Sequence, residues 1–277
     1  MKKVLVRQLP LSFSYQAAGK IWHLQPDSVT KCLALEVRSN LQDVHFAYLC
    51  PAQDKVIFEG LALEGGILTS LLACHDGILL LQQYQELENP GSATVLALDS
   101  RQQEVRWAVQ NYRPLFFTPT ESIGKSGGGE ENEESWVALK LQSGASRILA
   151  QAELAQLLAE QQGLKQQEQE RYLPAAYLEG EEHFKSVAQF LQLYLQMNAQ
   201  NSCEYLHVFD KIVISFYTAD GELLQNHLAV FDLEGTLLLH QPLADGLKKP
   251  GADAFMVWNK HLFFIENSTC LRGYNLQ

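Results

Sequence analysis

Val95-Leu-Ala-Leu-Asp99, followed by Val105-Arg-Trp107, is the stretch of this chain that says most about its fold. A short apolar strand ends at a polar turn, and a second strand carries a large apolar residue eight positions after the aspartate. The pattern recurs where residues 46–50 lead to Phe58, residues 137–141 to Leu149, and residues 229–232 to Leu239. One hairpin cannot bury both of its apolar faces, so such repeats become stable when they stack on one another.

The spacing of these hairpins predicts a β-propeller-like fold. The corresponding turn positions are Cys50, Asp99, Leu141, Asp232 and Asn275. The distances between successive positions are 49, 42, 91 and 43 residues. Propeller repeats are about 40–45 residues long. We therefore expect an all-β ring of five to six small antiparallel blades. The last blade lacks a fourth strand, which residues 11–15 can supply. The N- and C-terminal strands would then close the ring and remove an exposed sheet edge.

Two segments interrupt the strand pattern within a predicted single domain over residues 1–277. Residues 151–199 predict a helical insertion or a degenerate blade, because residues 151–160 are built from strong helix formers. The apolar spacing within residues 182–198 fits either a helix or a strand. Residues 119–135 are rich in glycine and acidic side chains, which predicts a mobile surface loop.

Composition narrows the class of protein. The chain has 277 residues, of which 47% are hydrophobic and 19% are charged, as in folded globular proteins. Its net charge of −11 argues against nucleic-acid binding, which depends on clustered lysine and arginine. Five cysteines without a CxxC pair favour a reducing compartment. The N-terminal apolar run is too short for a secretory signal and no stretch is long enough to span a bilayer, so we expect a cytoplasmic protein without membrane contact.

Three residues are candidates for binding. Glu36 and Arg38 lie two positions apart in a predicted inner strand and therefore share one face of it. They form either an ion pair that fixes the packing of a blade or the lining of a polar ligand site, because an unpaired buried charge is costly. Trp258 precedes a predicted turn at Asn259 and Lys260, which makes it a candidate for an exposed aromatic contact.

No catalytic constellation is visible in the sequence. Gly124-Lys125-Ser126 lacks the earlier glycine of a phosphate-binding loop, because Pro119 stands at that position. The eight histidines show no HxH or HExxH spacing. We therefore expect no cofactor, no metal site and no catalytic residue.

The strand and tryptophan pattern of residues 95–99 and 105–107 resembles the blade of quinoprotein-like β-propellers. Residues 19–22, 35–38 and 262–267 are similar to an uncharacterised family of Bacteroidetes-type bacteria that has no assigned activity. The resemblance implies a propeller-like fold and transfers no catalytic residue to this chain.

These observations support two hypotheses about function. The first is a non-enzymatic propeller that holds another protein or a peptide, since repeats are present and catalytic groups are not. The second is a ligand-binding or hydrolytic propeller with a polar site in its central channel, formed by Glu36, Arg38 and a histidine from another blade. The sequence does not specify an oligomeric state.

Overall fold

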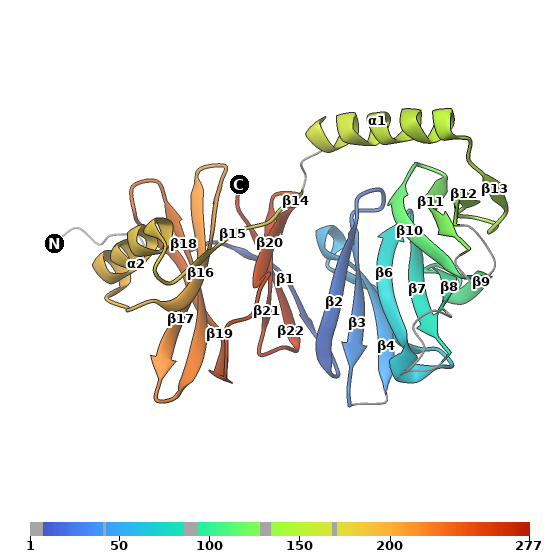
Figure 1. Cartoon of the computed structure of the whole chain (residues 1–277). Coiled ribbons are helices and arrows are strands. Elements are labelled where there is room, and N and C mark those ends of the chain that lie inside the picture. The colour runs from blue at the N-terminus through green and yellow to red at the C-terminus, as the bar shows by residue number, and fades with distance from the viewer. Residues whose placement is uncertain (1–7, 41–42, 86–92, 128–133, 168–170) are drawn as a thin grey trace. The chain divides into compact units, whose positions relative to one another are not determined.

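The computed structural model shows a chain that consists mainly of antiparallel strands (Figure 1). It describes every residue except 1–7, 41–42, 86–92, 128–133 and 168–170. The sequence predicts one domain over residues 1–277, whereas the contacts divide the chain into two compact units. The middle unit comprises residues 18–169, and the terminal unit comprises residues 1–17 and 170–277. Among the described residues, none of the helices combines the length and apolar character needed to cross a membrane.

The middle unit contains three four-stranded sheets and one long helix. The first sheet has the order β2 (Lys20–Asp27), β3 (Cys32–Arg38), β4 (Val44–Cys50) and β5 (Lys55–Ala62). The second has β6 (Thr69–His75), β7 (Ile78–Tyr84), β8 (Ala93–Asp99) and β9 (Glu104–Gln110). The third has β10 (Tyr112–Phe117), β11 (Glu121–Ser126), β12 (Ser135–Lys140) and β13 (Ser146–Ile148), and it is followed by α1 (Gln151–Gln167). Short 3-10 turns at Pro51–Gln53 and Gly66–Leu68 flank β5.

The terminal unit contains two five-stranded sheets and the shorter helix α2 (Glu182–Leu195). One sheet has the order β15 (Ala175–Leu178), β16 (Gln200–Val208), β17 (Lys211–Asp220), β18 (Leu223–Asp232) and β19 (Leu237–Leu247). The other has the order β1 (Leu11–Gln16), β22 (Cys270–Asn275), β21 (His261–Glu266), β20 (Phe255–Trp258) and β14 (Arg171–Tyr172).

Inner strands are apolar on both faces because sheets cover both sides of them. In β7 of the second sheet, Leu79 and Leu81 pack in a core that also contains Phe46 of the first sheet. The alternate residues Ile78 and Leu80 belong to the core shared with the third sheet. Side chains alternate between the two faces of a strand, so a continuous apolar run is what a sheet packed between two others requires. The stacking predicted from the hairpin repeats is thus present in the middle unit.

The predicted pairing of the two ends of the chain is confirmed. Strand β1 runs antiparallel to β22, with Leu11 opposite Tyr274 and Phe13 opposite Gly273. Gly273 has no space for a side chain, because an added Cβ would lie 2.8 Å from the ring of Phe263. Residues more than 250 positions apart therefore complete one sheet, and β1 covers an edge of β22 that would otherwise be open.

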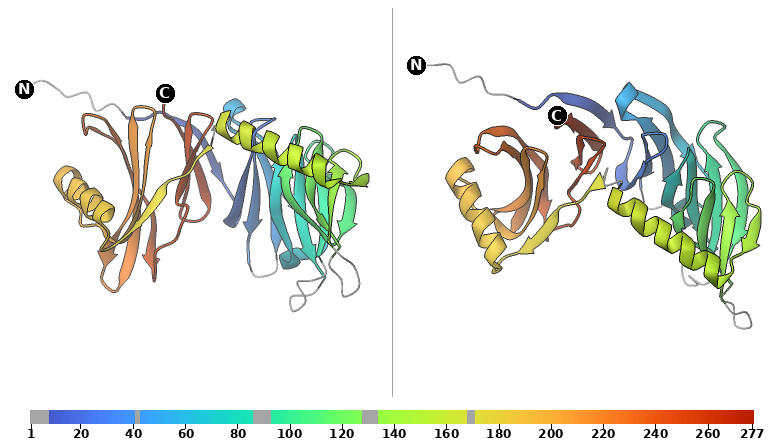
Figure 2. Two further views of the ribbon diagram at one scale, coloured as in Figure 1. Left: turned by 45° about the horizontal axis from the view of Figure 1, so that its top comes forward. Right: turned by 90° about the horizontal axis from the view of Figure 1, so that it is seen from above.

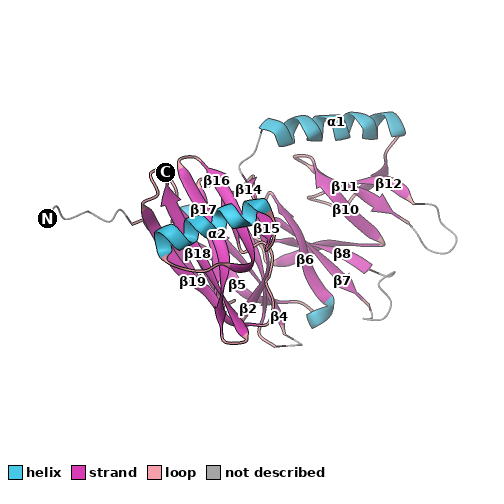
Figure 3. Cartoon of the chain, turned by 60° about the vertical axis from the view of Figure 1, so that its left-hand side comes forward, coloured by secondary structure: helices cyan, strands magenta, loops and turns pink. Residues whose placement is uncertain are grey.

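Residues 151–199 contain the two helices. The apolar spacing within residues 182–198 fits either a helix or a strand, and the structure shows a helix over residues 182–195. Helix α2 places Phe184, Val187 and Leu191 on one buried face, a spacing of three and four residues that matches one side of a helix. Figure 3 shows α2 lying across the β15–β19 sheet. The short strands β14 and β15 lie between the helices and add one strand to each sheet of the terminal unit. Helix α1 is a single long helix in the views of Figure 2.

The prediction of a loop over residues 119–135 is wrong at residues 121–126, which form β11. This strand pairs with β10 on one side and β12 on the other, and its Ile123 is fully buried. Gly124 serves close packing there, because an added Cβ would lie 2.8 Å from the ring of Tyr112. The glycine-rich residues 128–133 lie outside the described part of the chain.

Candidate functional site

Glu36 forms a fully satisfied ion-pair cluster. The carboxylate is 0% exposed and accepts hydrogen bonds from Arg38 Nε at 2.7 Å and from His23 Nδ1 at 2.8 Å. It also accepts the backbone N–H of Leu71 at 2.8 Å, which joins β3 to β6 of the next sheet. Both carboxylate oxygens are used within the protein. These contacts favour the first interpretation of Glu36 and Arg38, an ion pair that fixes the packing of neighbouring sheets.

Asp27, at the end of β2, makes the same kind of contact. Its carboxylate accepts the backbone N–H groups of Gly77 at 2.7 Å and Asp76 at 3.1 Å in the turn between β6 and β7, and the Tyr48 hydroxyl at 2.8 Å. Burial alone would raise its pKa, but the hydrogen bonds from Gly77, Tyr48 and Thr30 outweigh it and hold the pKa below the usual value.

Glu204 repeats this arrangement in the terminal unit. Located in β16, it accepts the backbone N–H of Asp253 at 2.6 Å and of Ala254 at 2.9 Å, just before β20 of the neighbouring sheet. Burial raises its pKa, and the two backbone hydrogen bonds counteract that only in part. Three buried carboxylates thus bind backbone amides of the next sheet, which points to a recurrent structural role.

The expectation that Trp258 is an exposed contact residue is wrong, because only 3% of it is exposed. It lies in β20 with its ring 6.2 Å from that of Phe263, so the neighbouring turn does not carry it outward. The exposed tryptophan is Trp22 in β2, which is 56% exposed and has the guanidinium of Arg38 4.7 Å above its ring.

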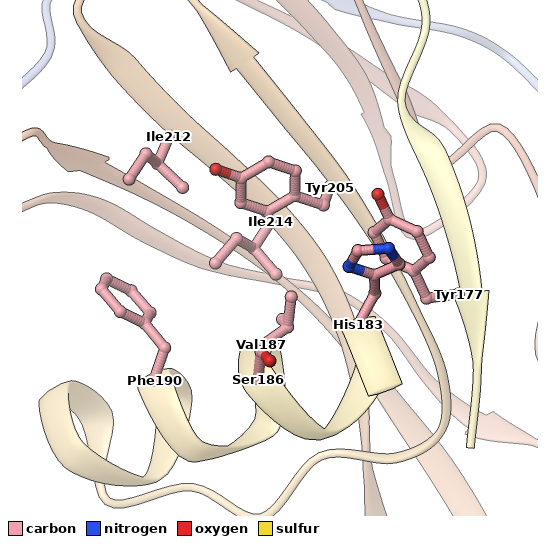
Figure 4. A pocket seen from close by; sticks show the side chains of 8 residues that line it. All are labelled: Tyr177, His183, Ser186, Val187, Phe190, Tyr205, Ile212 and Ile214. Carbon is pink, nitrogen blue, oxygen red and sulfur yellow. The ribbon is translucent and has the colours of Figure 1, made fainter. Parts of the chain in front are cut away.

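A pocket of about 340 Å³ lies between α2 and strands β15, β16 and β17. Figure 4 shows its lining side chains, with those of α2 on one side and those of the strands on the other. The apolar part is formed by Val187, Phe190, Ile212 and Ile214. Helix α2 buries Phe184, Val187 and Leu191 against the sheet and lines the pocket with the adjoining side of the helix. A volume of this size lies at the lower end of the range for ligand sites, ~300–1,000 Å³.

Four polar side chains complete the lining: Tyr177 from β15, His183 and Ser186 from α2, and Tyr205 from β16. The rings of Tyr177 and His183 are 5.0 Å apart. Burial, with a smaller contribution from the nearby phenol of Tyr177, raises the pKa of Tyr205, so the phenol of Tyr205 is neutral at physiological pH. In the described part of the chain, neither phenol has a hydrogen-bond partner. The pocket therefore offers an apolar floor and two available hydroxyl groups.

This pocket could not be predicted from the sequence. Tyr177 and Tyr205 are 28 positions apart and become neighbours only because β15 pairs with β16, with Tyr177 opposite Cys203 and Ala175 opposite Tyr205. The amphipathic pattern of α2 was the one signal available, and it marks the helix face that is buried.

The histidines do not gather into a metal site. The closest pair among those described is His227 and His240, with ring centroids 5.4 Å apart in neighbouring strands. No group of three or more histidine, cysteine, aspartate or glutamate side chains within the described residues is arranged to hold a metal ion.

Comparison with known proteins adds a partial family match. Residues 26–107 match the model of a domain of unknown function, DUF4905, which is a stretch from the end of β2 to Trp107 in β9. The pocket beside α2 lies outside this stretch. No curated protein matches the chain.

Among the solved structures that match the chain, three illustrate a coarse similarity. TolB from Acinetobacter baumannii is 9% identical with a TM-score of 0.32, and the match covers 83% of this chain and 45% of TolB, less than half of that protein. The β-propeller domain of the trilobed protease from Pyrococcus furiosus is 9% identical with a TM-score of 0.35, covering 93% of this chain and 80% of the domain. A hypothetical protein from Leishmania major is 11% identical with a TM-score of 0.26, covering 99% and 91% of the two chains.

Proposed function

We propose that this chain is a non-enzymatic binding protein that holds a peptide or a protein segment, with one side chain of the partner seated in the pocket beside α2. The observation that carries the proposal is the pocket itself, where two phenol groups that have no partner among the described residues lie beside aliphatic side chains. Binding sites are commonly concave and largely apolar, with a few polar groups that fix orientation.

We further propose that the sheets within each unit are propeller-like blades. The stacking of successive sheets in the middle unit supports this proposal, and in the terminal unit β1 completes a sheet by pairing with β22. Stacked sheets display binding groups on a rigid scaffold, which keeps the conformational cost of binding low.

A second function at Glu36 and Arg38 has less support. A ligand there would have to displace the hydrogen bonds from His23 and Leu71 that already fill the carboxylate. We therefore place the binding function at the α2 pocket.

A displayed library of random peptides, selected against the wild-type protein and the Ser186→Trp variant, tests the proposal. Ser186 lines the pocket from an exposed position on α2, so a tryptophan there would fill the pocket without entering the core. Gln189→Trp, on the same helix but outside the lining, is the matched control.

We expect enriched peptides that bind the wild-type and Gln189→Trp proteins and lose binding to Ser186→Trp. They should also shift the methyl NMR signals of Ile212 and Ile214. The proposal is refuted if no peptide is enriched, or if enriched peptides bind Ser186→Trp as well as the wild type and leave both isoleucines unshifted.

A further inference from the structure

An acidic chain segment, the rim, supplies most of the lining of the α2 pocket. Residues 177–190, which supply five of the eight lining side chains, contain Glu179, Glu181 and Glu182 but only one lysine, Lys185, besides His183. The three glutamates and Lys185 are exposed. Glu181 and Glu179 accept backbone hydrogen bonds, from Leu178 at 3.0 Å and from Asn201 at 2.7 Å. These bonds fix the two carboxylates at the backbones of β15 and β16, the strands that carry Tyr177 and Tyr205.

The negative charge of this rim reaches beneath α2. Cys203, fully buried in β16, has its pKa raised to about 12 by burial, then by the charge of Glu204 and then by that of Glu181. Cys203 is directly opposite Tyr177 in the sheet, so the charge of Glu181 acts on the part of the sheet that carries this lining residue.

The aromatic side chains of the lining also favour a positive charge. Tyr177, Tyr205 and Phe190 present rings whose faces attract cations, and phenol oxygens accept hydrogen bonds from ammonium or guanidinium groups. A carboxylate or phosphate would meet three glutamates at the rim and would be repelled.

Resting on the proposed function, we infer that the side chain which enters the pocket is a lysine or an arginine of the partner. Its methylene stem would lie against Val187, Ile212 and Ile214, while its cation would remain between the tyrosine hydroxyls and the glutamates of the rim. Long basic side chains commonly bury their stems and keep their charge near water in this way.

Three blocked peptides test the inference: acetyl-Gly-Gly-X-Gly-Gly-amide with X as lysine, norleucine or glutamate. Norleucine retains a four-carbon stem and removes the charge, so it is the matched probe. Binding is followed through the methyl signals of Ile212 and Ile214. We expect the lysine peptide to bind at least roughly five-fold more tightly than the norleucine peptide, and the glutamate peptide to produce no shift.

The glutamates of the rim provide the complementary test. Glu181→Gln and Glu182→Gln should each weaken the lysine peptide roughly two- to five-fold, since exposed charge pairs contribute modestly, and should leave the norleucine peptide unaffected. Glu222→Gln, an exposed glutamate in the turn between β17 and β18, is the control and should change neither.

The two proposals fail in different ways. Equal binding of norleucine and lysine, or a lysine affinity that is indifferent to Glu181→Gln and Glu182→Gln, overturns the inference and leaves the binding pocket in place. If neither these probes nor the library peptides shift the two isoleucines, the proposed function fails.

Discussion

Acid should destabilise the terminal unit through His227. This residue lies in β18, is 5% exposed and stacks on Phe216 with ring centroids 5.2 Å apart. Its Nε2 shares a hydrogen bond of 3.0 Å with the hydroxyl of Thr218, whereas its Nδ1 is buried without a partner among the described residues. Burial, and then the charge of nearby His240, lower the pKa of His227 from 6.5 to about 4.

The magnitude follows from this pKa difference. A change of 6.5 − 4 = 2.5 pKa units at about 1.36 kcal/mol each corresponds to about 3 kcal/mol of folding free energy. Because the folded-state pKa is the lower one, the unfolded chain binds the proton more tightly. The stability associated with the neutral form of His227 is therefore fully present above pH 6.5 and is lost as the pH falls towards 4. By pH 4.5 about 2.5 kcal/mol should be gone.

Hydrogen exchange of β18 amides between pH 7.5 and 4.5, corrected for intrinsic exchange rates, measures this loss within the terminal unit alone. His227→Phe removes the titrating group and should be less sensitive to pH than the wild type by about 2.5 kcal/mol over this range. His207→Gln, an exposed histidine in β16, should follow the wild type. Parallel profiles for wild type and His227→Phe, or an NMR titration of His227 near pH 6.5, would refute the reasoning.

Substitutions at two further residues, Glu36 and Gly124, test the packing within the middle unit. Glu36→Ala leaves the part-buried Arg38 without its carboxylate and should lower the free energy of unfolding by about 3–5 kcal/mol. Glu36→Gln keeps an acceptor for the backbone N–H of Leu71 and should lower the free energy of unfolding by about 1–3 kcal/mol. Urea denaturation measures both, and equal costs would contradict the ion-pair role. Gly124→Ala should lower the stability by about 1–3 kcal/mol in the same assay, because its Cβ would overlap the carbonyl of Arg113 and the ring of Tyr112. Gly251→Ala is the control, since its Cβ would meet only the Tyr217 hydroxyl at 3.7 Å, and a similar loss there would show that crowding is not the cause.

Much of the strand architecture could be predicted from local sequence. Apolar runs such as Leu79 to Leu81 require cover on both faces, and the aligned positions Phe58 and Trp107 are buried as the hairpin repeat implies. Strand β11 was missed because its sequence, Glu-Ser-Ile-Gly-Lys-Ser, carries a single large apolar residue. Its extended form depends on hydrogen bonds to β10 and β12, which a local pattern does not contain.

The candidate site depended on tertiary structure to a greater degree. The sequence placed Glu36 and Arg38 on one face of a strand, because two residues separated by one position share a face, and in the structure they form an ion pair. It could not show that the second oxygen of the Glu36 carboxylate accepts hydrogen bonds from His23 and from the backbone N–H of Leu71. It also misjudged Trp258, since proximity to a turn says nothing about which face of the strand is covered.

By itself, the sequence determined the stacked antiparallel hairpins and the pairing of β1 with β22, because alternation, turn residues and the need to bury apolar faces act over short stretches or at chain ends. Only the tertiary structure decided that residues 182–195 form a helix and that a pocket remains beside it. A pocket is the space left where packing stops, and that depends on how distant strands are brought together rather than on any one segment.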